Sequence, residues 1–522
     1  MEGNTPTAIL LGEQSLLIRC AEILIDNGWA VNAVVSQNQA ITDWCEENGI
    51  PGFVTFQSLK GGFSANSVDC VFSITNLKIL PGWVVSLGSQ AINFHDGPLP
   101  RYAGLNAPVW AILNDESEHG VTWHEMTDNV DEGRILAQQM FPIVPGETAL
   151  SINAKCYQSA IDTFATLVAD LNSDSVKALP QDLSGRSYYG LTKRPDGAGL
   201  IDWSQPVESI ERMVRALDHG AYANPLISPK MVVGGTPIAV LEAKIYARES
   251  SYALGEIVGL SQDGLRVACS GGILEITRVA GLSGHRYSCM EQFADAYQLK
   301  VGAMVGGPDD TDLRSSLSNR LMDVCRYEEA WVRDLLSAEA VAIPYDSAVE
   351  SLSTSNSWET RDLSLPANVL SDAGYVQDKS AFLLALVSLL FARLNSKTDY
   401  TFAMAAGESK SIASFFEAFL PLPVCVDESL PFEALIKVSA DATKRLQKMG
   451  GLASDIRLRH PELKGHGLLK QFAVKLFMDT SIDMGAVSLD EESALYISLS
   501  ESNGALTFYF NQAKVSAKVM DT

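Results

Sequence analysis

The chain has 522 residues, 47% of them hydrophobic and 20% charged, and its 39 Lys and Arg against 63 Asp and Glu leave a net charge of −24. This composition is typical of a soluble globular protein, and at about 150 residues per domain the length predicts about three domains. Because the chain is so acidic, we expect neither a nucleic acid nor an anionic membrane surface as a partner.

The eight cysteines are scattered singly, without the paired spacing of a zinc site. We therefore expect reduced thiols, no bound metal and a cytoplasmic protein. The first 11 residues lack the basic segment and long apolar segment of a signal peptide. The longest apolar run, residues 381–392, is too short to cross a bilayer and predicts a buried helix.

Short apolar runs alternate with helical patterns over residues 1–180, which predicts an α/β domain with a largely parallel sheet. The predicted strands are 8–12, 30–35, 70–74, 91–94 and 121–126, and a helix is predicted at 15–26. Gly12 follows the first strand without a G-x-G-x-x-G motif, so nothing supports a dinucleotide. The crevice at the carboxyl ends of the strands should bind something else.

A polar, turn-rich stretch at residues 180–199 separates this domain from the next one. A helix at 206–218 precedes five short predicted strands, whose regular spacing predicts a small β-barrel within residues 181–300. These strands are 231–233, 238–247, 255–260, 265–269 and 273–279.

A second boundary falls in the Gly- and Asp-rich stretch at residues 302–312. Residues 313–522 mix helices and strands and predict an α+β lobe. We expect helices at 316–338, 379–394 and 432–449, and a terminal hairpin formed by 494–500 and 505–511 around the turn Ser502-Asn503-Gly504.

One strand carries two polar residues, Asn93 and His95, which the two-residue period of a strand places on the same face. The strand ends at the turn Gly97-Pro98-Leu99-Pro100, and a later strand runs into a loop that contains Asp131. An amide, an imidazole and a carboxylate suit acyl transfer to an amine. The first two donate hydrogen bonds to the developing oxyanion, and the carboxylate keeps the imidazole charged and accepts the amine proton.

The pattern N-x-H-x-x-x-L-P-x-Y-x-G-x-x-x-P from Asn93, followed by G-V-T-x-H-x-M-x-x-x-x-D-x-G-x-I-L from Gly120, resembles the catalytic core of the 10-formyltetrahydrofolate-dependent formyltransferases. The resemblance implies a Rossmann-like core over 1–180 and 10-formyltetrahydrofolate as formyl donor. It places Asn93, His95 and Asp131 at the catalytic positions. It also implies a donor pocket, largely of backbone groups, at Leu77, Lys78, Ile79, Leu80, Thr127, Asp128 and Val130.

The resemblance extends over residues 7–282, because 188–218 and 255–276 are similar to the second domain of methionyl-tRNA formyltransferase, with its small open β-barrel. The turn Gly97-Pro98-Leu99-Pro100 departs from the family's Ser-Leu-Leu-Pro at the point where the acceptor enters. This departure leaves the identity of the acceptor open and does not affect the expected formyl donor. The acidic charge also argues against transfer RNA as the acceptor.

Residues 382–394, 414–424 and 509–511 resemble the C-terminal lobe of a nonribosomal peptide synthetase condensation domain. No two of the seven histidines are adjacent, so the condensation family's His-His-x-x-x-Asp is missing and the lobe should be non-catalytic. The combination implies transfer of a formyl group to an amine in natural-product biosynthesis of the nonribosomal peptide type. For a free acceptor, residues after Asp312 should be dispensable.

Several alternatives remain open at this point. The acceptor is either a free small molecule or an amine tethered to a carrier protein, which would dock at the C-terminal lobe. A second reaction is hydrolysis of 10-formyltetrahydrofolate to formate, with water in place of the acceptor. A third reading is a non-enzymatic module that only docks carrier proteins.

Four residues near these motifs are interpreted as structural. We expect His124 to pack or to form hydrogen bonds and Asp96 to be a turn residue beside the site that modulates acceptor binding. We expect Trp110 and Trp123 to be core aromatics.

Three further polar residues lie outside these motifs. Arg215, in a predicted helix, should form an ion-pair anchor between domains. We expect His460 and His466, which lie near two arginines in the sequence, on a solvated surface.

Overall fold

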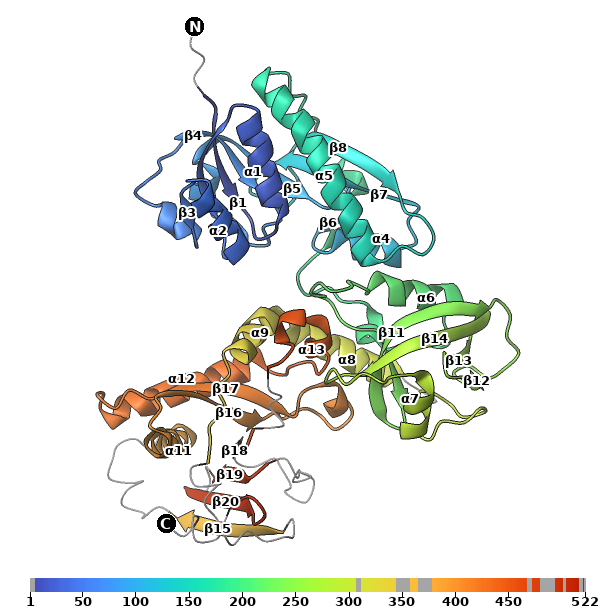
Figure 1. Ribbon diagram of the computed structural model, residues 1–522, viewed down its shortest axis with the longest axis vertical. Helices are drawn as coiled ribbons and strands as arrows, with labels where there is room; N and C mark the ends of the chain where they lie inside the picture. Colours follow the sequence, from blue (N-terminus) through green and yellow to red (C-terminus); the bar gives the residue numbers. More distant parts are fainter. Residues whose placement is uncertain are drawn as a thin grey trace.

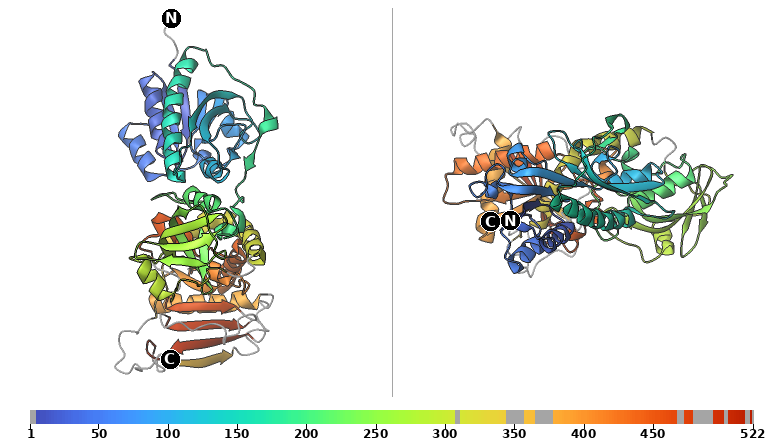
Figure 2. Two further views of the ribbon diagram at one scale, coloured as in Figure 1. Left: turned by 90° about the vertical axis from the view of Figure 1, so that its right-hand side faces the viewer. Right: turned by 90° about the horizontal axis from the view of Figure 1, so that it is seen from above.

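The computed structural model describes residues 5–306, 311–343, 357–364, 378–466, 472–478, 493–500, 504–515 and 520. Figures 1 and 2 show three units that follow one another along the long axis, each built around its own sheet. In this part of the chain, no helix is long and apolar enough to cross a membrane.

The first unit is a seven-stranded sheet in the order β3-β2-β1-β4-β5-β7-β8. Its strands from β1 to β5 pair in parallel, as predicted, but β7 and β8 are antiparallel. Strand β8 was not predicted, because its residues are only partly buried and leave no apolar run in the sequence. The elements are β1 (Thr7–Leu11), α1 (Leu16–Asp26), β2 (Ala30–Val35), α2 (Gln39–Glu47), β3 (Gly52–Phe53), β4 (Val68–Ser73), α3 (Gly82–Val85), β5 (Gly88–His95), α4 (Ala107–Leu113), β7 (Glu118–Glu125), β8 (Ile135–Pro142) and α5 (Ala149–Asn172).

The core of this unit is aromatic. Trp123 packs against Phe94 and Phe164, and its ring Nε1 donates to Thr163 Oγ1 at 3.0 Å. Trp110 is also buried and stacks on Tyr189. Both tryptophans are therefore core aromatics, as expected. Gly12 is required for close packing, since a Cβ there would lie 1.9 Å from the carbonyl oxygen of Ile74.

The second unit is a five-stranded antiparallel sheet in the order β10-β11-β14-β13-β12, which corresponds to the predicted small barrel. A short parallel pair between β6 (Ala103–Gly104) and β9 (Tyr188–Tyr189) ties the polar connecting stretch to the first unit. The remaining elements are the 3-10 turn η3 (Asp196–Gly199), α6 (Val207–Ala216), β10 (Lys230–Val233), β11 (Thr236–Ala247), β12 (Ile257–Leu260), β13 (Leu265–Cys269), β14 (Gly272–Gly281) and α7 (Met290–Ala296).

Arg215 on α6 does not form the ion pair between domains that was expected. Its ion pair is with Glu211 of the same helix, at 2.6 Å. The contact that reaches the first unit is a hydrogen bond from Arg215 Nη1 to the carbonyl oxygen of Glu147. Arg215 therefore anchors the two units through a backbone group, not through an ion pair.

The third unit begins with two helices where one was predicted. α8 (Thr311–Val324) and α9 (Glu328–Leu336) are separated by the 3-10 turn η4 (Cys325–Tyr327). The chain turns there because the two helices belong to different cores. Leu317 and Leu321 of α8 belong to the buried cluster that continues from the first unit through the connecting stretch, whereas Trp331 of α9 packs into a core of the third unit.

The sheet of the third unit has six strands in the order β15-β20-β19-β18-β16-β17. Alternate residues face two separate cores, so Phe402 contacts one cluster and Ala403 the other. The helices predicted at 379–394 and 432–449 and the antiparallel hairpin β19-β20 are confirmed, although residues 502 and 503 of its turn lie outside the described residues. The elements are β15 (Trp358–Ser364), α11 (Lys379–Asn395), β16 (Asp399–Ala405), β17 (Phe419–Cys425), α12 (Phe432–Met449), α13 (Ile456–Arg459), β18 (Val474–Met478), β19 (Leu495–Ser500) and β20 (Ala505–Asn511).

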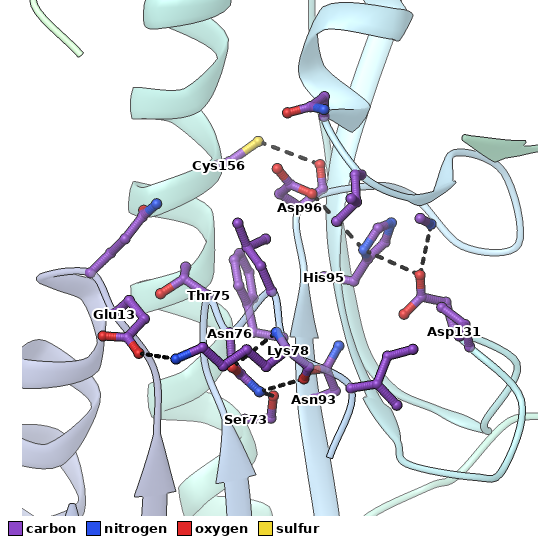
Figure 3. A pocket seen from close by; sticks show the side chains of 18 of the residues that line it. Glu13, Ser73, Thr75, Asn76, Lys78, Asn93, His95, Asp96, Asp131 and Cys156 are labelled. Carbon is purple, nitrogen blue, oxygen red and sulfur yellow. Dashed lines mark hydrogen bonds and ion pairs between the residues drawn. The ribbon is translucent and has the colours of Figure 1, made fainter. Parts of the chain in front are cut away.

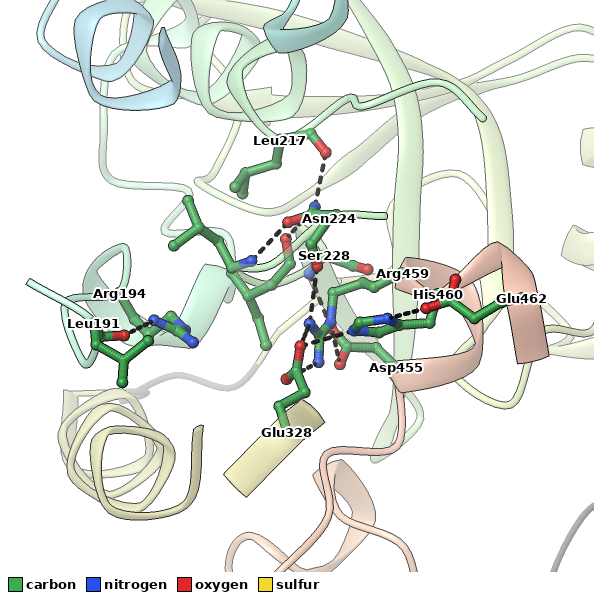
Figure 4. A network of polar contacts seen from close by, with 12 residues as sticks. Leu191, Arg194, Leu217, Asn224, Ser228, Glu328, Asp455, Arg459, His460 and Glu462 are labelled. Carbon is green, nitrogen blue, oxygen red and sulfur yellow. Dashed lines mark hydrogen bonds and ion pairs between the residues drawn. The ribbon is translucent and has the colours of Figure 1, made fainter. Parts of the chain in front are cut away.

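Buried charges join the second and third units (Figure 4). Lys230 Nζ lies 3.2 Å from Asp455 Oδ2, Arg459 Nε donates to Asp455 Oδ1 at 3.0 Å, and Arg459 also donates to both carboxylate oxygens of Glu328. Although burial opposes the ionised form, Arg459 and Lys230 hold the pKa of Asp455 well below its usual range. The third unit is therefore tied to the rest of the chain by paired charges.

His460 takes part in the same network, so the expectation that it lies on a solvated surface was wrong. Its Nε2 is 2.9 Å from Glu328 Oε1 and its Nδ1 is 2.9 Å from Glu462 Oε1. Desolvation opposes the charged ring, but Glu328 and Glu462 raise the pKa of His460 above its ordinary value. His466 is exposed, as expected.

Candidate active site

The carboxyl end of β5 brings the predicted polar pair to the edge of the first sheet (Figure 3). Asn93 and His95 lie on one face of the strand, while Phe94 between them packs into the core. The strand pairs in antiparallel register with β7, and Asn93 lies opposite His124. Two imidazoles and one amide therefore meet at this edge.

Asp131 reaches the same place from the loop between β7 and β8. Its backbone adopts the left-handed region with a φ of 57°, which aspartate tolerates better than most residues. Gly133 lets the loop close, because a Cβ there would lie 1.8 Å from the carbonyl oxygen of Glu125. The backbone N–H of Gly104 donates to Asp131 Oδ2 at 2.8 Å, which fixes the carboxylate.

The buried carboxylate of Asp131 faces both histidines. Its Oδ2 is 3.8 Å from His95 Nδ1, and its Oδ1 is 3.5 Å from His124 Nε2. Burial alone would raise the pKa of Asp131, but His124, His95 and the Gly104 N–H lower it to about 2. Asp131 is therefore a carboxylate at neutral pH.

A backbone carbonyl fixes the tautomer of His95. His95 Nε2 is 2.7 Å from the carbonyl oxygen of Tyr102, which only accepts, so Nε2 carries a hydrogen. Nδ1 then faces two carboxylates, Asp131 at 3.8 Å and Asp96 at 3.9 Å. At these distances the contacts are electrostatic and not hydrogen bonds.

His124, which was expected only to pack or to form hydrogen bonds, lies at the centre of the site. Its Nδ1 donates to the carbonyl oxygen of Glu125 at 2.8 Å, and its Nε2 is 3.1 Å from Asn93 Nδ2. The expected hydrogen-bonding role is confirmed, but Asp131 lies closer to His124 than to His95. The G-V-T-x-H motif was the only sequence feature that marked His124. It could not place His124 beside Asn93, because that position depends on the antiparallel register of β5 and β7.

His119, on β7, was missed. It is fully buried, and its Nε2 donates to the carbonyl oxygen of Asp96 at 2.8 Å. Desolvation lowers the pKa of His119 to about 4, so the ring is neutral at pH 7. His119 therefore supports the backbone at Asp96, whose side chain is about one-third exposed beside His95.

A cavity of about 1510 Å³ lies at the carboxyl edge of the sheet, and its lining includes Asn93, His95, Asp96, His124 and Asp131. Leu77 and Ile79 are exposed at its border, and Lys78 Nζ lies 3.4 Å from Glu13 Oε1. All seven residues predicted for the donor pocket line this cavity: Leu77, Lys78, Ile79, Leu80, Thr127, Asp128 and Val130.

The cavity has a further wall that the sequence did not predict. Leu150 and Tyr157 of α5 and residues from the connecting segments, Leu191, His219 and Tyr222, also line it. Leu191, His219 and Tyr222 are distant in sequence from the motifs, and the packing of the second unit on the first brings them to the cavity. Among the described residues, no group of three or more His, Cys, Asp or Glu side chains is arranged to hold a metal ion.

An open α/β sheet with an amide, imidazoles and carboxylates around a cavity at its carboxyl edge has the groups that an acyl-group transferase requires. Residues 27–167 match the family model of formyl transferase, and residues 196–297 match that of the formyl transferase C-terminal domain. Both matched segments lie within the first 297 residues of the chain. The formyltransferase part of the sequence resemblance is confirmed, and the condensation-like nature of residues 313–522 stays a prediction.

Solved structures similar to this chain include formyltransferases from several bacteria. An N-formyltransferase from Helicobacter canadensis, in complex with folinic acid and dTDP-3-aminofucose, is 17% identical, with 52% of this chain and 99% of that chain aligned and a TM-score of 0.41. HypX from Aquifex aeolicus, in complex with tetrahydrofolic acid, is 17% identical over 57% of this chain and 48% of that chain, with a TM-score of 0.42. A 4-N formyltransferase from Francisella tularensis is 18% identical over 45% of this chain and 96% of that chain, with a TM-score of 0.39.

Proposed function

We propose that this protein transfers a formyl group from 10-formyltetrahydrofolate to an amine in natural-product biosynthesis of the nonribosomal peptide type. One observation carries the transfer reaction. Asn93, His95 and Asp131, the residues that the family motif marks, converge on a single large cavity inside a segment that matches the formyl transferase family.

The chemistry sets requirements for this site. The amine nitrogen forms a bond to the formyl carbon, and the carbonyl oxygen becomes an oxyanion. The bond between the formyl carbon and the donor nitrogen then breaks, so the amine loses one proton and the donor nitrogen gains one. The site must therefore stabilise a negative oxygen and move one proton.

His95 and Asn93 would stabilise the oxygen. The Tyr102 carbonyl occupies His95 Nε2–H, which leaves Nδ1 as the group that can donate toward the cavity. The carboxylates of Asp131 and Asp96 face this nitrogen at 3.8 and 3.9 Å. One hydrogen of the Asn93 amide contacts His124 Nε2, and its second hydrogen is then oriented for the same oxygen.

Asp131 would handle the proton. Its carboxylate lies between the two histidines and stabilises positive charge on the attacking nitrogen. Because its pKa is held at about 2, it holds a proton only briefly, and the proton passes on to the leaving nitrogen of the donor.

The cavity border fits the donor. A pterin is a flat heterocycle with donors and acceptors along its edge, and it suits a slot with apolar side chains and accessible backbone. The loops at 77–80 and 127–130 line the cavity, and Leu77 and Ile79 are 68% and 85% exposed there. Exposed apolar side chains beside a cavity are typical of a ligand site.

The biosynthetic setting rests on residues 313–522. Their likeness to a condensation-domain lobe and their α+β architecture support a place beside a peptide-assembling enzyme, with the amine either free or tethered to a carrier protein. This lobe would bind a carrier protein and not catalyse condensation.

The test is an assay of the full chain with 10-formyltetrahydrofolate and a panel of amines, in which N-formylated product and formate are both measured. We expect amine-dependent formylation. Formate release that does not depend on any amine would indicate the hydrolase alternative. Isothermal titration should show binding of 5-formyltetrahydrofolate and none of NAD or ATP, and a protein that binds no folate would indicate a non-enzymatic docking module.

A further inference from the structure

The cavity that holds the site is poor in positive charge. Among the described residues that line it, Lys78 is the single Lys or Arg, and its Nζ already lies 3.4 Å from Glu13 Oε1. Four carboxylates line the same cavity: Glu13, Asp96, Asp128 and Asp131. The four carboxylates would repel a phosphate or diphosphate group, because the described lining residues offer no second Lys or Arg to compensate for them.

Asp96 stands at the reacting centre with part of its side chain open to the cavity. Its Oδ1 is 3.9 Å from His95 Nδ1, and in the described part of the chain it forms no ion pair with Lys or Arg. His119 Nε2 donates a hydrogen bond to the backbone carbonyl oxygen of Asp96 at 2.8 Å. Burial raises the pKa of Asp96, against the opposing effect of His95, and an ammonium group that enters beside His95 would favour the carboxylate form of Asp96.

Part of the cavity wall is apolar and aromatic. Leu150 packs so closely on the connecting segment that a Cβ on Gly220 would meet its Cδ2 at 2.6 Å. Tyr157 lies near both Asp96 and Tyr222, whose charges add to burial in raising the pKa of its hydroxyl. Tyr222 is 73% exposed although it lines a cavity, so its ring is available to a ligand.

We propose that the acceptor is an unphosphorylated primary amine with an apolar body, whose ammonium group binds at Asp96 and whose body lies against Leu150, Tyr157 and Tyr222. This inference rests on the proposed formyl transfer. The bound ammonium loses one proton to water before it attacks, and the neutral nitrogen then forms the new bond to the formyl carbon. A free amine and a thioester-tethered aminoacyl group share this chemistry.

The first experiment compares acceptors with the full chain at saturating 10-formyltetrahydrofolate. Leucine amide, serine amide and O-phosphoserine amide differ in apolar surface and in phosphate charge, and a nucleotide-linked amino sugar adds a diphosphate. We expect kcat/KM to be highest for leucine amide and at least about tenfold lower for O-phosphoserine amide than for serine amide, the cost of one unfavourable charge contact. The thioester of leucine with pantetheine distinguishes a tethered acceptor from a free one.

Two variants with matched controls test the residues. In Asp96→Asn we expect the KM of leucine amide to rise about tenfold, the loss of one charge-assisted hydrogen bond, while the KM of the donor stays within about twofold. Asp43→Asn removes the same charge from an exposed position on α2, outside the cavity, and should change neither KM. Tyr222→Ala should reduce the preference for leucine amide over glycine amide. Tyr252→Ala, which changes another exposed tyrosine, outside the cavity, should leave this preference unchanged.

The outcomes separate this inference from the function on which it rests. Preferred formylation of the phosphorylated amide or of the nucleotide-linked sugar would leave formyl transfer standing and overturn the acceptor class. An unchanged amine KM in Asp96→Asn would likewise remove Asp96 as the ammonium site. If the protein binds 5-formyltetrahydrofolate and formylates no amine, formyl transfer itself fails and the acceptor class fails with it.

Discussion

Arg459 and Asn224 exchange two hydrogen bonds across the boundary between the third unit and the second. Arg459 Nη1 donates to the carbonyl oxygen of Asn224 at 3.0 Å, and the Asn224 N–H donates to the carbonyl oxygen of Arg459 at 2.8 Å. The neighbours of Asn224 in the chain, Ala223 and Pro225, line the cavity. A residue of the C-terminal lobe therefore holds part of the wall of the candidate active site, although the lobe contributes no group to the reacting centre.

Replacing Arg459 tests this connection without deleting the lobe. Arg459→Met should reduce the free energy of unfolding by about 3–5 kcal/mol, because it leaves the buried carboxylates of Glu328 and Asp455 without their main partner. Urea unfolding measures this loss. Where the variant stays folded, the acceptor KM should rise more than the donor KM.

Arg393→Met is the matched control, since the Arg393 side chain is 69% exposed and lies 3.9 Å from Glu428. It should change stability by less than about 1 kcal/mol. If Arg459→Met changes neither stability nor the acceptor KM, the connection between the lobe and the cavity wall has no effect on the site. That result would support the prediction that residues after Asp312 are dispensable for a free acceptor.

His95→Ala should lower kcat by about 10²–10³-fold, which is the scale of a lost oxyanion donor. Asn93→Ala should lower kcat by the same factor or a somewhat smaller one, because His95 remains as a donor. Steady-state formylation measures both, and folate titration should show that the donor still binds. Turnover near that of the unmodified protein in His95→Ala would place the chemistry elsewhere.

Asp131→Asn should be at least as damaging to kcat as His95→Ala. The substitution preserves the shape but removes the charge that faces both His95 and His124, and with it the group that takes the amine proton. Circular dichroism provides the control for folding. A variant with unchanged kcat would show that the proton leaves by another route.

His124→Ala should have a smaller effect, a loss of about five- to tenfold in kcat. His124 Nε2 orients the Asn93 amide through one hydrogen bond, and a hydrogen bond of this kind contributes about 0.5–1.5 kcal/mol. The donor KM should not change. If the loss equals that of His95→Ala, His124 acts on the substrate directly and not through Asn93.

Stability should fall between pH 6.5 and pH 4 because of His119. Its pKa is lowered to about 4 in the folded protein, so in this range the unfolded chain takes up a proton that the folded chain refuses. The loss should be about 3 kcal/mol, from a shift of about 2.5 pH units. His119→Gln should lose this part of the pH dependence, measured by urea unfolding across the range. His460, whose pKa is raised, contributes in the opposite direction and is unchanged in both proteins.

Local patterns determined much of this protein. The two-residue period of β5 predicted that Asn93 and His95 share a face, and the structure places them so. The helices α11 and α12 and the terminal hairpin are also confirmed, because an apolar period is a property of neighbouring residues. The motif around Asp131 likewise predicted a carboxylate at the site.

Tertiary structure decided the rest. The place of His124 depends on the antiparallel register of β5 and β7, and the break between α8 and α9 depends on two separate cores. His460 is buried because Glu328, 132 residues away, supplies its partner. The wall at Tyr222 exists only because the second unit packs on the first. A sequence shows which side chains are polar, but whether a charge is buried, and against what, depends on residues that only folding brings together.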